Sequence, residues 1–354
     1  MRNRFLRLTV VLSLAGCASN PTDATKPAAQ ATDKSTHAGA GGEPSAAKSA
    51  GATFSLPPLA AGYSRLKAAT ITDIEPGADV TFCQYVLPPV DRDMDILAVH
   101  GGQSQYGHHV VAFSYTGTGN EELNKSSACG ATEFTAGDPS TPSSSNGHAM
   151  GQGGFLGSAA TDVPEGVAFR LKQGDGVMLN IHYINVGDVA IDGESYLDMK
   201  LEPADPQRKI ASLFTSVNIG FNLDPHAHVD SSMDCVVKSD LQFLLMANHM
   251  HEYGVSAATE VRRAGSEAVE LLHEDPTWAP EMQFNPVFAR WTAATPFVLH
   301  AGDTLRTRCS WNNTTSASIA FPREMCISAG FVLTSGDKPV APGTCVSSSW
   351  IPAP

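Results

Sequence analysis

The sequence is poor in charge and contains no long apolar run. Only 17% of its 354 residues are charged, and 36 acidic residues outnumber 23 basic ones, which gives a net charge of −13. A nucleic-acid-binding protein needs a basic patch to neutralise phosphates, so we expect no nucleic-acid partner. No apolar stretch reaches the roughly 20 residues of a membrane-spanning helix. This excludes a polytopic membrane protein.

Helical periodicity over ten or more residues is also scarce. From residue 55 onward, short apolar runs alternate with turn residues, in keeping with the 31 glycines and 23 prolines. Such runs occupy residues 95–99, 110–114, 176–181 and 241–246. The pattern predicts an all-β fold of antiparallel β-sandwich or jelly-roll type. About 300 residues are many for one sandwich, so we expect two in tandem.

The first residues are typical of an export signal. Three arginines precede a short apolar stretch that ends in Leu14-Ala15-Gly16-Cys17, and this ending resembles a bacterial lipobox. The resemblance implies a lipid-modified Cys17, and Ala18 favours the outer membrane or cell surface. The following segment is rich in Ala, Gly, Ser, Thr, Pro and Lys, so it cannot bury enough apolar surface to fold. We expect it to act as a flexible tether.

These features predict the organisation of the chain. A signal peptide occupies residues 1–17, and a low-complexity tether occupies residues 18–57. An N-terminal β-sandwich follows at residues 58–203, and a C-terminal β-sandwich at residues 204–354. The proline-rich stretch at 201–206 is the expected joint.

Six cysteines remain after Cys17, and an even number in an exported protein indicates disulfides. No C-x-x-C spacing is present, so structural bridges are favoured over a metal site. Six cysteines allow fifteen connectivities. Their spacing does not choose among them.

Twelve histidines are present, and five of them form three clusters. His108 and His109 precede an apolar run, His182 ends another, and His249 and His251 form an H-x-H pair. Residues i and i+2 of a strand share a face, so His249 and His251 can converge on one metal. Adjacent His108 and His109 would need a bulge or strand end to do the same.

The remaining histidines are expected to be structural, because a lone histidine is more often hydrogen-bonded than metal-bound. They include a second H-x-H pair in a predicted loop, which shows how weak one such pair is. They are His37, His100, His148, His226, His228, His273 and His300.

Taken in order, five motifs resemble one family. They are His108-His109 before an apolar strand, the run PEGVAF at 164–169, LNIHY at 179–183, His249-x-His251, and Glu324-Met325-Cys326. Between about residues 80 and 333 the chain resembles the copper type II, ascorbate-dependent monooxygenases. That family includes peptidylglycine α-hydroxylating monooxygenase and dopamine β-monooxygenase.

The resemblance implies two copper ions in separate sandwiches. His108, His109 and His182 would hold one copper that relays an electron. The catalytic site would consist of His249, His251 and Met325, holding the copper that activates O₂. Imidazole suits copper, and a soft thioether favours Cu(I). A methionine ligand argues against zinc, which takes Cys, His or carboxylate.

The same resemblance implies a disulfide pattern. It pairs Cys309 with Cys326 and Cys235 with Cys345, which leaves Cys83 for Cys129. A bridge beside Met325 would fix the position of a weakly bound thioether.

The substrate-binding positions depart from the family. The arginine two residues before the H-x-H pair is Ala247 here, and the asparagine and tyrosine that follow the E-M-C motif are Ile327 and Ala329. In the amidating enzyme, those three residues anchor a glycine carboxylate. The glutamine that precedes the family's third histidine is Asn180. The metal ligands are therefore retained, while the pocket is not that of a peptide-amidating enzyme.

The sequence thus predicts a dicopper monooxygenase that hydroxylates an activated C–H bond of a small molecule. Its partners would be O₂, an external ascorbate-like reductant and a membrane reached through the lipid anchor, and the chain would be a monomer. The alternative is a lipoprotein that binds or carries copper without turnover. A third possibility is an all-β adhesin in which the histidines are incidental.

Overall fold

The computed structural model describes residues 54–117, 121–129, 149–153, 163–283, 286–321, 323–334 and 341–352. The expected signal peptide, Cys17, the tether as far as residue 53, and His37 and His148 lie outside the described residues. No helix in the described part of the chain is long and apolar enough to cross a membrane.

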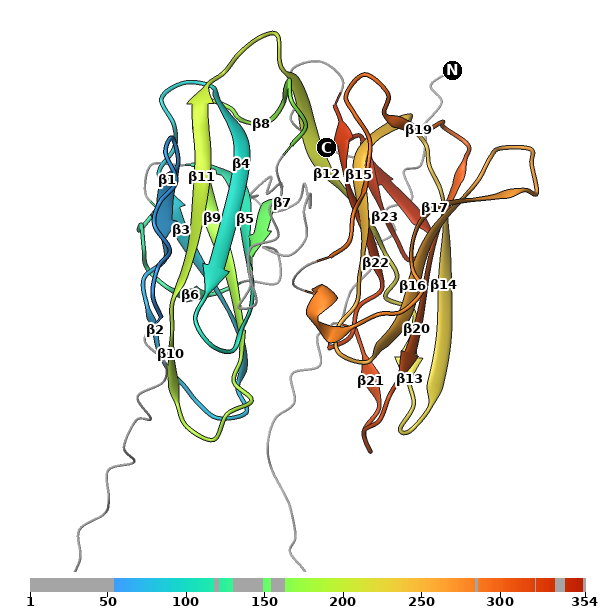
Figure 1. The fold of residues 1–354 in the computed structure, drawn as a ribbon, viewed down its shortest axis with the longest axis horizontal. Coiled ribbons are helices and arrows are strands. Elements are labelled where there is room, and N and C mark those ends of the chain that lie inside the picture. The colour runs from blue at the N-terminus through green and yellow to red at the C-terminus, as the bar shows by residue number, and fades with distance from the viewer. Residues whose placement is uncertain are drawn as a thin grey trace, which may run out of the picture. The chain divides into compact units, whose positions relative to one another are not determined.

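The fold is all-β, as the sequence predicts, with one short 3-10 helix and no α-helix in the described ranges. Eleven strands fall between residues 64 and 203, which we call the first half (Figure 1). They are β1 (Ser64–Lys67), β2 (Ile71–Ile74), β3 (Asp79–Leu87), β4 (Met94–Gln103), β5 (Gly107–Thr116), β6 (Ser127–Ala128), β7 (Ala149–Gly153), β8 (Val167–Leu171), β9 (Asp175–Ile184), β10 (Ile191–Gly193) and β11 (Ser195–Pro203).

The other thirteen strands fall between residues 209 and 352, the second half. They are β12 (Lys209–Val217), β13 (Asn222–Leu223), β14 (His228–Val236), β15 (Leu241–His249), β16 (Gly254–Arg262), β17 (Val269–Asp275), β18 (Ala289–Arg290), β19 (Phe297–Leu299), β20 (Thr304–Asn312), β21 (Ile319–Ala320), β22 (Ile327–Leu333), β23 (Gly343–Val346) and β24 (Ser349–Pro352), with the 3-10 helix η1 at Pro280–Gln283.

Each half is a sandwich-like pair of sheets. In the first half, the sheet β1-β11-β4-β8 is matched by the sheet β6-β3-β9-β5-β7. In the second half, a sheet containing β12-β22-β15 is matched by β14-β20-β16-β17. Strand β9 is buried along most of its length because it lies between β3 and β5. Its apolar run therefore forms part of the core of the first half.

One strand pairing joins the two halves among the described residues. Strand β8 pairs in parallel with β12, matching Val167 with Lys209 and Ala168 with Ile210. The turn that leads into β8 places Gly166 at a φ of 76°, which favours glycine. The pairing makes one 11-stranded sheet that runs through both halves.

Three disulfides are present, with the pairings that the family resemblance implies: Cys83–Cys129, Cys235–Cys345 and Cys309–Cys326. The latter two each connect strands or strand ends of the two opposing sheets of the second half. Disulfides persist in oxidising compartments. They therefore indicate an exported protein.

Candidate metal centre

The first histidine set lies on two neighbouring central strands. His109 on β5 pairs directly with His182 on β9, and the register shifts between Gly107 and His109. This irregularity at His108 is the bulge that two adjacent histidines need in order to face one point. Ring nitrogens of His108, His109 and His182 lie within 4.8 Å of one another. The structure thus brings together the three residues predicted for one metal.

Side-chain oxygens orient two of these rings. His109 Nε2 lies 3.0 Å from Asn180 Oδ1, and His182 Nε2 lies 2.6 Å from Asp79 Oδ1. In each pair the imidazole N–H donates to the oxygen, which leaves Nδ1 with its lone pair. Oxygen partners of this kind fix the tautomer of a metal-binding histidine and raise its basicity.

The Cys83–Cys129 disulfide in turn orients Asn180. The amide nitrogen of Asn180 lies 3.4 Å from Cys129 Sγ and 3.9 Å from Cys83 Sγ. With its nitrogen directed at sulfur, Asn180 presents its oxygen to His109. The disulfide therefore helps to orient His109 through Asn180, in addition to linking β3 to the end of β6.

The third ring is oriented from the other half of the molecule. His108 Nε2 lies 3.0 Å from Oε1 of Gln283, a buried residue at the end of η1. Meanwhile, Nδ1 of His108 lies 3.1 Å from Nδ1 of His109. With metal–nitrogen bonds of about 2.0 Å, that separation corresponds to an angle of about 100° at a shared metal. Both nitrogens are thus spaced as ligands of one ion.

The sequence predicts that His249 and His251 lie on one continuous strand, and the structure differs in part. Strand β15 ends at His249, and His251 lies just beyond it. The two rings still meet, with centroids 5.1 Å apart and planes nearly perpendicular. Between them, Met250 is fully buried in an apolar cluster with Trp311. The pair therefore converges through a strand end and not through strict strand alternation.

One ring nitrogen of this set has no partner. His251 Nδ1 donates to the backbone carbonyl of Arg323 at 3.0 Å, which leaves Nε2 as an acceptor. That Nε2 atom is buried and has no hydrogen-bond partner among the described residues. An unsatisfied buried polar atom is rare and destabilising. A metal ion bound to Nε2 would satisfy it.

A buried carboxylate organises the backbone around this set. Glu324 Oε2 accepts hydrogen bonds from the amides of His251 (3.0 Å) and Met325 (3.1 Å) and from Trp311 Nε1 (3.0 Å). Its Oε1 accepts from the amide of Tyr253 at 2.9 Å. Burial raises the pKa of Glu324, and these four donors oppose that shift. Through these hydrogen bonds the carboxylate links the backbone just beyond the end of β15, at His251 and Tyr253, to the backbone amide of Met325.

Met325 is half-buried between Glu324 and the Cys309–Cys326 bridge. Its backbone is therefore fixed on both sides. The role of its thioether as a ligand stays a prediction.

Burial keeps four of these histidines, His108, His109, His249 and His251, in the neutral form that binds metal. It lowers the pKa of His109 to about 3, with a further contribution from His182, and that of His251 to about 4. Burial likewise lowers the pKa values of His108 and His249, and neighbouring imidazoles add to both shifts.

The three positions that depart from the family lie together beside His249. Ala247 on β15 pairs with Ala329 on β22, and His249 pairs with Ile327. On the opposite face of β15, Asn248 donates to Asp275 at 2.8 Å and anchors the strand end from behind. The surface next to His249 is therefore built from small or apolar side chains.

The other described histidines lie outside the two histidine sets. His228 Nδ1 lies 2.8 Å from Asn312 Oδ1, and His300 Nδ1 lies 3.3 Å from Asp240. The ring of His100 contacts that of Tyr63 at a tilt, with centroids 5.1 Å apart. His273 Nε2 lies 3.3 Å from Asp275 Oδ2, although it is buried and forms no hydrogen bond with any described residue. His226 lies in a turn at a φ of 54°.

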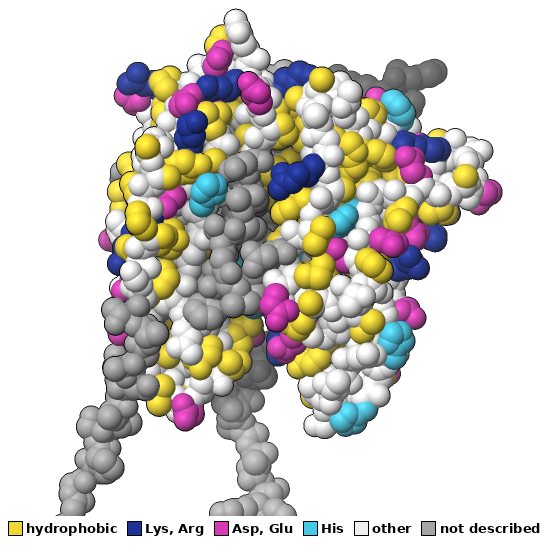
Figure 2. Space-filling view, in the orientation of Figure 1, with side chains coloured by type: hydrophobic (Ala, Val, Ile, Leu, Met, Phe, Trp, Pro, Cys, Tyr) yellow, Lys and Arg dark blue, Asp and Glu magenta, His cyan; other side chains and the backbone are white. Residues whose placement is uncertain are grey.

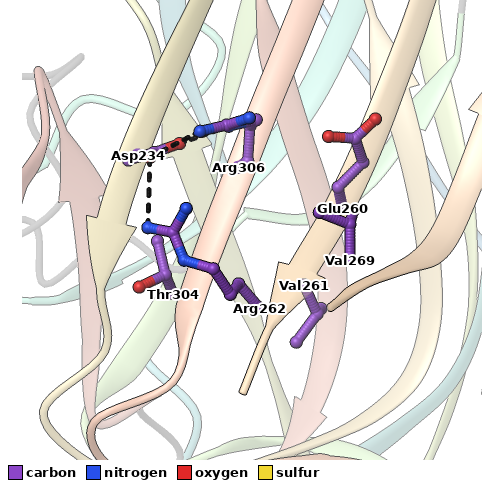
Figure 3. A pocket seen from close by; sticks show the side chains of 7 residues that line it. All are labelled: Asp234, Glu260, Val261, Arg262, Val269, Thr304 and Arg306. Carbon is purple, nitrogen blue, oxygen red and sulfur yellow. Dashed lines mark hydrogen bonds and ion pairs between the residues drawn. The ribbon is translucent and has the colours of Figure 1, made fainter. Parts of the chain in front are cut away.

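A surface hollow in the second half contains none of the candidate ligands. Figure 3 shows Asp234 paired with Arg306 at 2.6 Å and with Arg262 at 3.6 Å. Also lining the hollow is Glu260, which pairs with Arg308 at 2.9 Å. On the face drawn in Figure 2, basic and acidic side chains of the described residues are interspersed. We find no ligand site in this hollow.

Sequence reasoning missed four supporting residues: Asp79, Asn180, Gln283 and Glu324. A signal existed for Asn180, which shares a strand face with His182, and for Glu324, which belongs to the E-M-C motif. Gln283 gives no such signal, because it lies 175 residues from His108.

No protein-family model and no curated protein matches the chain. Among solved structures, it is similar to the major capsid protein P2 of bacteriophage PM2, with 9% identity and a TM-score of 0.37 over 78% of this chain and 99% of the other. It is also similar to PNGF-II, with 12% identity and a TM-score of 0.37 over 79% of this chain and 66% of the other. At these values, neither match bears on function.

Proposed function

We propose that the protein is a dicopper monooxygenase. The observation that carries this proposal is the set of three imidazoles whose Nε2 atoms are all held by side-chain oxygens. A histidine that is only structural has no need for two further imidazoles beside its Nδ1 atom. The buried, unpartnered Nε2 of His251 supports a second ligand set.

Copper fits the donor types of both sets. His108, His109 and His182 would form an all-imidazole site, which suits a metal that cycles between Cu(I) and Cu(II). His249, His251 and Met325 would form a softer site that stabilises Cu(I). When bound, the two ions would supply electron relay and O₂ activation.

The proposed reaction joins one oxygen atom of O₂ to the carbon of a C–H bond and releases the other as water. It consumes two electrons from an external, ascorbate-like reductant and two protons. The residues of the chain orient the ligands. Asp79, Asn180 and Gln283 fix the tautomers of the first set, and Glu324 fixes the backbone of the second.

The residues beside His249 favour a neutral or apolar substrate. Ala247, Ile327 and Ala329 offer neither a cation nor a side-chain hydrogen-bond donor. A carboxylate brought to this surface would lose hydration without gaining a partner there, which is unfavourable by several kcal/mol. We therefore expect a small molecule whose reacting part carries no charge.

The protein would act as a monomer at the membrane surface. The disulfides indicate export, and the lipobox-like ending at Cys17 adds a lipid anchor to this proposal. A flexible tether would then hold the two halves away from the bilayer.

The test measures copper content and O₂ uptake on the purified protein. We expect about two coppers per chain, and O₂ consumption that requires both copper and a reductant. Copper binding without reductant-dependent O₂ uptake would favour the alternative of a copper-carrying lipoprotein. Absence of copper binding would leave the histidines as incidental features of an adhesin.

A further inference from the structure

A layer of polar side chains crosses the core of the second half. Six strands, three from each of the two opposing sheets, contribute one residue each, and none of these residues is more than 4% exposed. We call this layer the polar belt, and it consists of Ser216 on β12, Asn248 on β15, Ser328 on β22, Thr307 on β20, Thr259 on β16 and Asp275 on β17. Core positions of a sandwich are usually apolar, so a complete polar layer requires an explanation.

The hydroxyl groups of the belt form a chain between the two sheets. Thr307 donates to Ser216 at 2.9 Å, and its hydroxyl lies 3.0 Å from that of Ser328. The Ser328 hydroxyl in turn lies 2.5 Å from the hydroxyl of Thr259. Each of these contacts joins a strand of one sheet to a strand of the other. The chain therefore holds the two sheets together at one level of the core.

Asn248 continues this chain to a buried carboxylate. Its Oδ1 accepts a hydrogen bond from Thr259 at 2.7 Å, and its Nδ2 donates to Asp275 Oδ2 at 2.8 Å. His273 Nε2 lies 3.3 Å from the same oxygen of Asp275. Thr259 and Asp275 both belong to the opposing sheet. Because both ends of its amide are engaged there, the side chain of Asn248 is fixed in one orientation.

The belt separates two apolar clusters of the second half. One cluster contains Phe243 and Val332, and the other contains Trp311 and Cys326. On three strands a belt residue lies between members of the two clusters: Met246, Asn248 and Met250 on β15 and just beyond it, Val261, Thr259 and Ala257 on β16, and Leu305, Thr307 and Cys309 on β20. Apolar side chains can repack in several ways, whereas a satisfied buried network specifies one arrangement of the sheets.

The belt lies directly behind one ligand of the second set. Asn248 pairs with Ser328 across the strands, and the next pair is His249 with Ile327. Successive residues of a strand point to opposite faces, so Asn248 faces the core of the sandwich while His249 faces away from it. Hydrogen bonds that fix Asn248 therefore fix the backbone from which His249 extends.

Strand β15 depends on such bonds at its end. Leu245 and Met246 are paired on both sides, with β22 and with β18. From Ala247 to His249, the described strands pair with β15 only on the β22 side. The bonds of Asn248 to the opposing sheet therefore hold an end that has lost one of its two neighbouring strands.

We propose that Thr259 and Ser328 are positioning residues for the second ligand set. Through Asn248 they fix the end of β15 and thereby the position of His249, whereas Glu324 acts on the chain beyond that strand. This inference rests on the proposed dicopper function, in which His249 is a ligand. Residues in the core of the sandwich, behind the ligands, then determine how well the second set binds copper.

The test removes one hydroxyl of the belt and keeps the shape of the side chain. Thr259→Val is compared with Thr259→Ser, which retains the hydroxyl, and with the matched control Thr215→Val. The Thr215 hydroxyl lies 2.7 Å from that of Thr344, outside the belt. Ser328→Ala repeats the test from the other strand if Thr259→Val does not fold. All variants carry His182→Ala, so that only the second set remains complete.

Two readouts follow the second set. Chelator competition gives its affinity for Cu(I), and nitrogen NMR of the metal-free protein gives the ring signals of the histidines, with those of His249 identified by their loss in His249→Ala. We expect Thr259→Val to lower the affinity about tenfold, the lower end of the range for outer-shell residues, and to shift the ring signals of His249. Thr259→Ser should retain both, and Thr215→Val should change neither.

The outcomes separate this inference from the proposed function. Unchanged Cu(I) affinity and unchanged His249 signals in a folded Thr259→Val variant overturn the positioning role, while copper uptake and O₂ consumption by the wild type would still support the monooxygenase. His249 signals that shift in Thr259→Val and return in Thr259→Ser, with a wild type that binds no copper, support the positioning role and overturn the proposed function.

Discussion

The two histidine sets are held in place by different means. In the first, each ring is oriented by its own side-chain oxygen, from Asn180, Asp79 or Gln283. In the second, the backbone is gathered by the single carboxylate of Glu324. The first set thus depends on several separate contacts, and the chain beyond β15 in the second depends on one. Losing one supporting residue should therefore disturb only part of the first set, whereas losing Glu324 should disturb the whole of the second.

The largest effect should come from removing a ligand. His249→Ala should abolish turnover and lose one copper, because the second set keeps only one imidazole, while the first set stays loaded. Metal analysis and reductant-dependent O₂ uptake check this. His182→Ala is the matched control and should lose the other copper. Loss of both coppers on the His249 substitution would contradict two ligand sets.

Met325→Ile tests the thioether. We expect the three-histidine site to stay loaded and O₂ consumption to stop, because the second metal loses its soft ligand. X-ray absorption of the Cu(I) protein should show a copper–sulfur contribution that disappears in this variant. Met250→Leu is the control, since Met250 is buried in the core. A wild-type spectrum without sulfur would return Met325 to a packing role.

Glu324→Leu tests the carboxylate that supports the second set. It leaves four N–H donors without their acceptor, so we expect the free energy of unfolding to fall by at least about 3 kcal/mol. Urea denaturation measures this. The control Glu252→Gln weakens surface interactions with Arg323 and Tyr253 and should cost less than about 1 kcal/mol. Equal effects of the two substitutions would remove the distinction between the sets.

Gln283→Ala tests one of the several supports of the first set. Loss of an outer-shell partner typically weakens metal binding by about ten- to a hundredfold, and we expect that range for the three-histidine site. Chelator competition measures the affinity. Glu281→Ala, an exposed residue in the same 3-10 helix, should leave it unchanged. An unchanged affinity in the Gln283 variant would show that His108 needs no help from the second half.

The smallest effect concerns substrate choice beside His249. Peptides ending in glycine should be very poor substrates of the wild type, because Ala247, Ile327 and Ala329 provide no carboxylate anchor. Ala247→Arg adds one charge-assisted hydrogen bond and should improve their binding by about tenfold. Mass spectrometry of the hydroxylated product checks both. Efficient turnover by the wild type would mean that other residues rebuild the anchor.

Much of the fold, and the placement of the candidate histidines on or beside strands, could be predicted from local features of the sequence, whereas their grouping into two ligand sets came from the family resemblance. Strands are specified by alternating apolar residues and by turn residues that lie only a few positions apart in the sequence. This is why β5, β9 and β15 lie where expected. The bulge at His108 follows from two adjacent histidines that face one point. The disulfide pairings came from the family resemblance, since six cysteines alone leave fifteen choices.

The supporting contacts required the tertiary structure. Glu324 stands next to Met325 in the sequence, yet its four hydrogen bonds reach residues up to 73 positions away. Gln283 reaches His108 across 175 positions, and His251 meets the same ring from the second half. Short-range periodicity determines which face of a strand a residue occupies. Which faces of two sandwiches meet depends on the shapes of all the side chains packed between them. Only the tertiary structure therefore decided that the two histidine sets form one cluster.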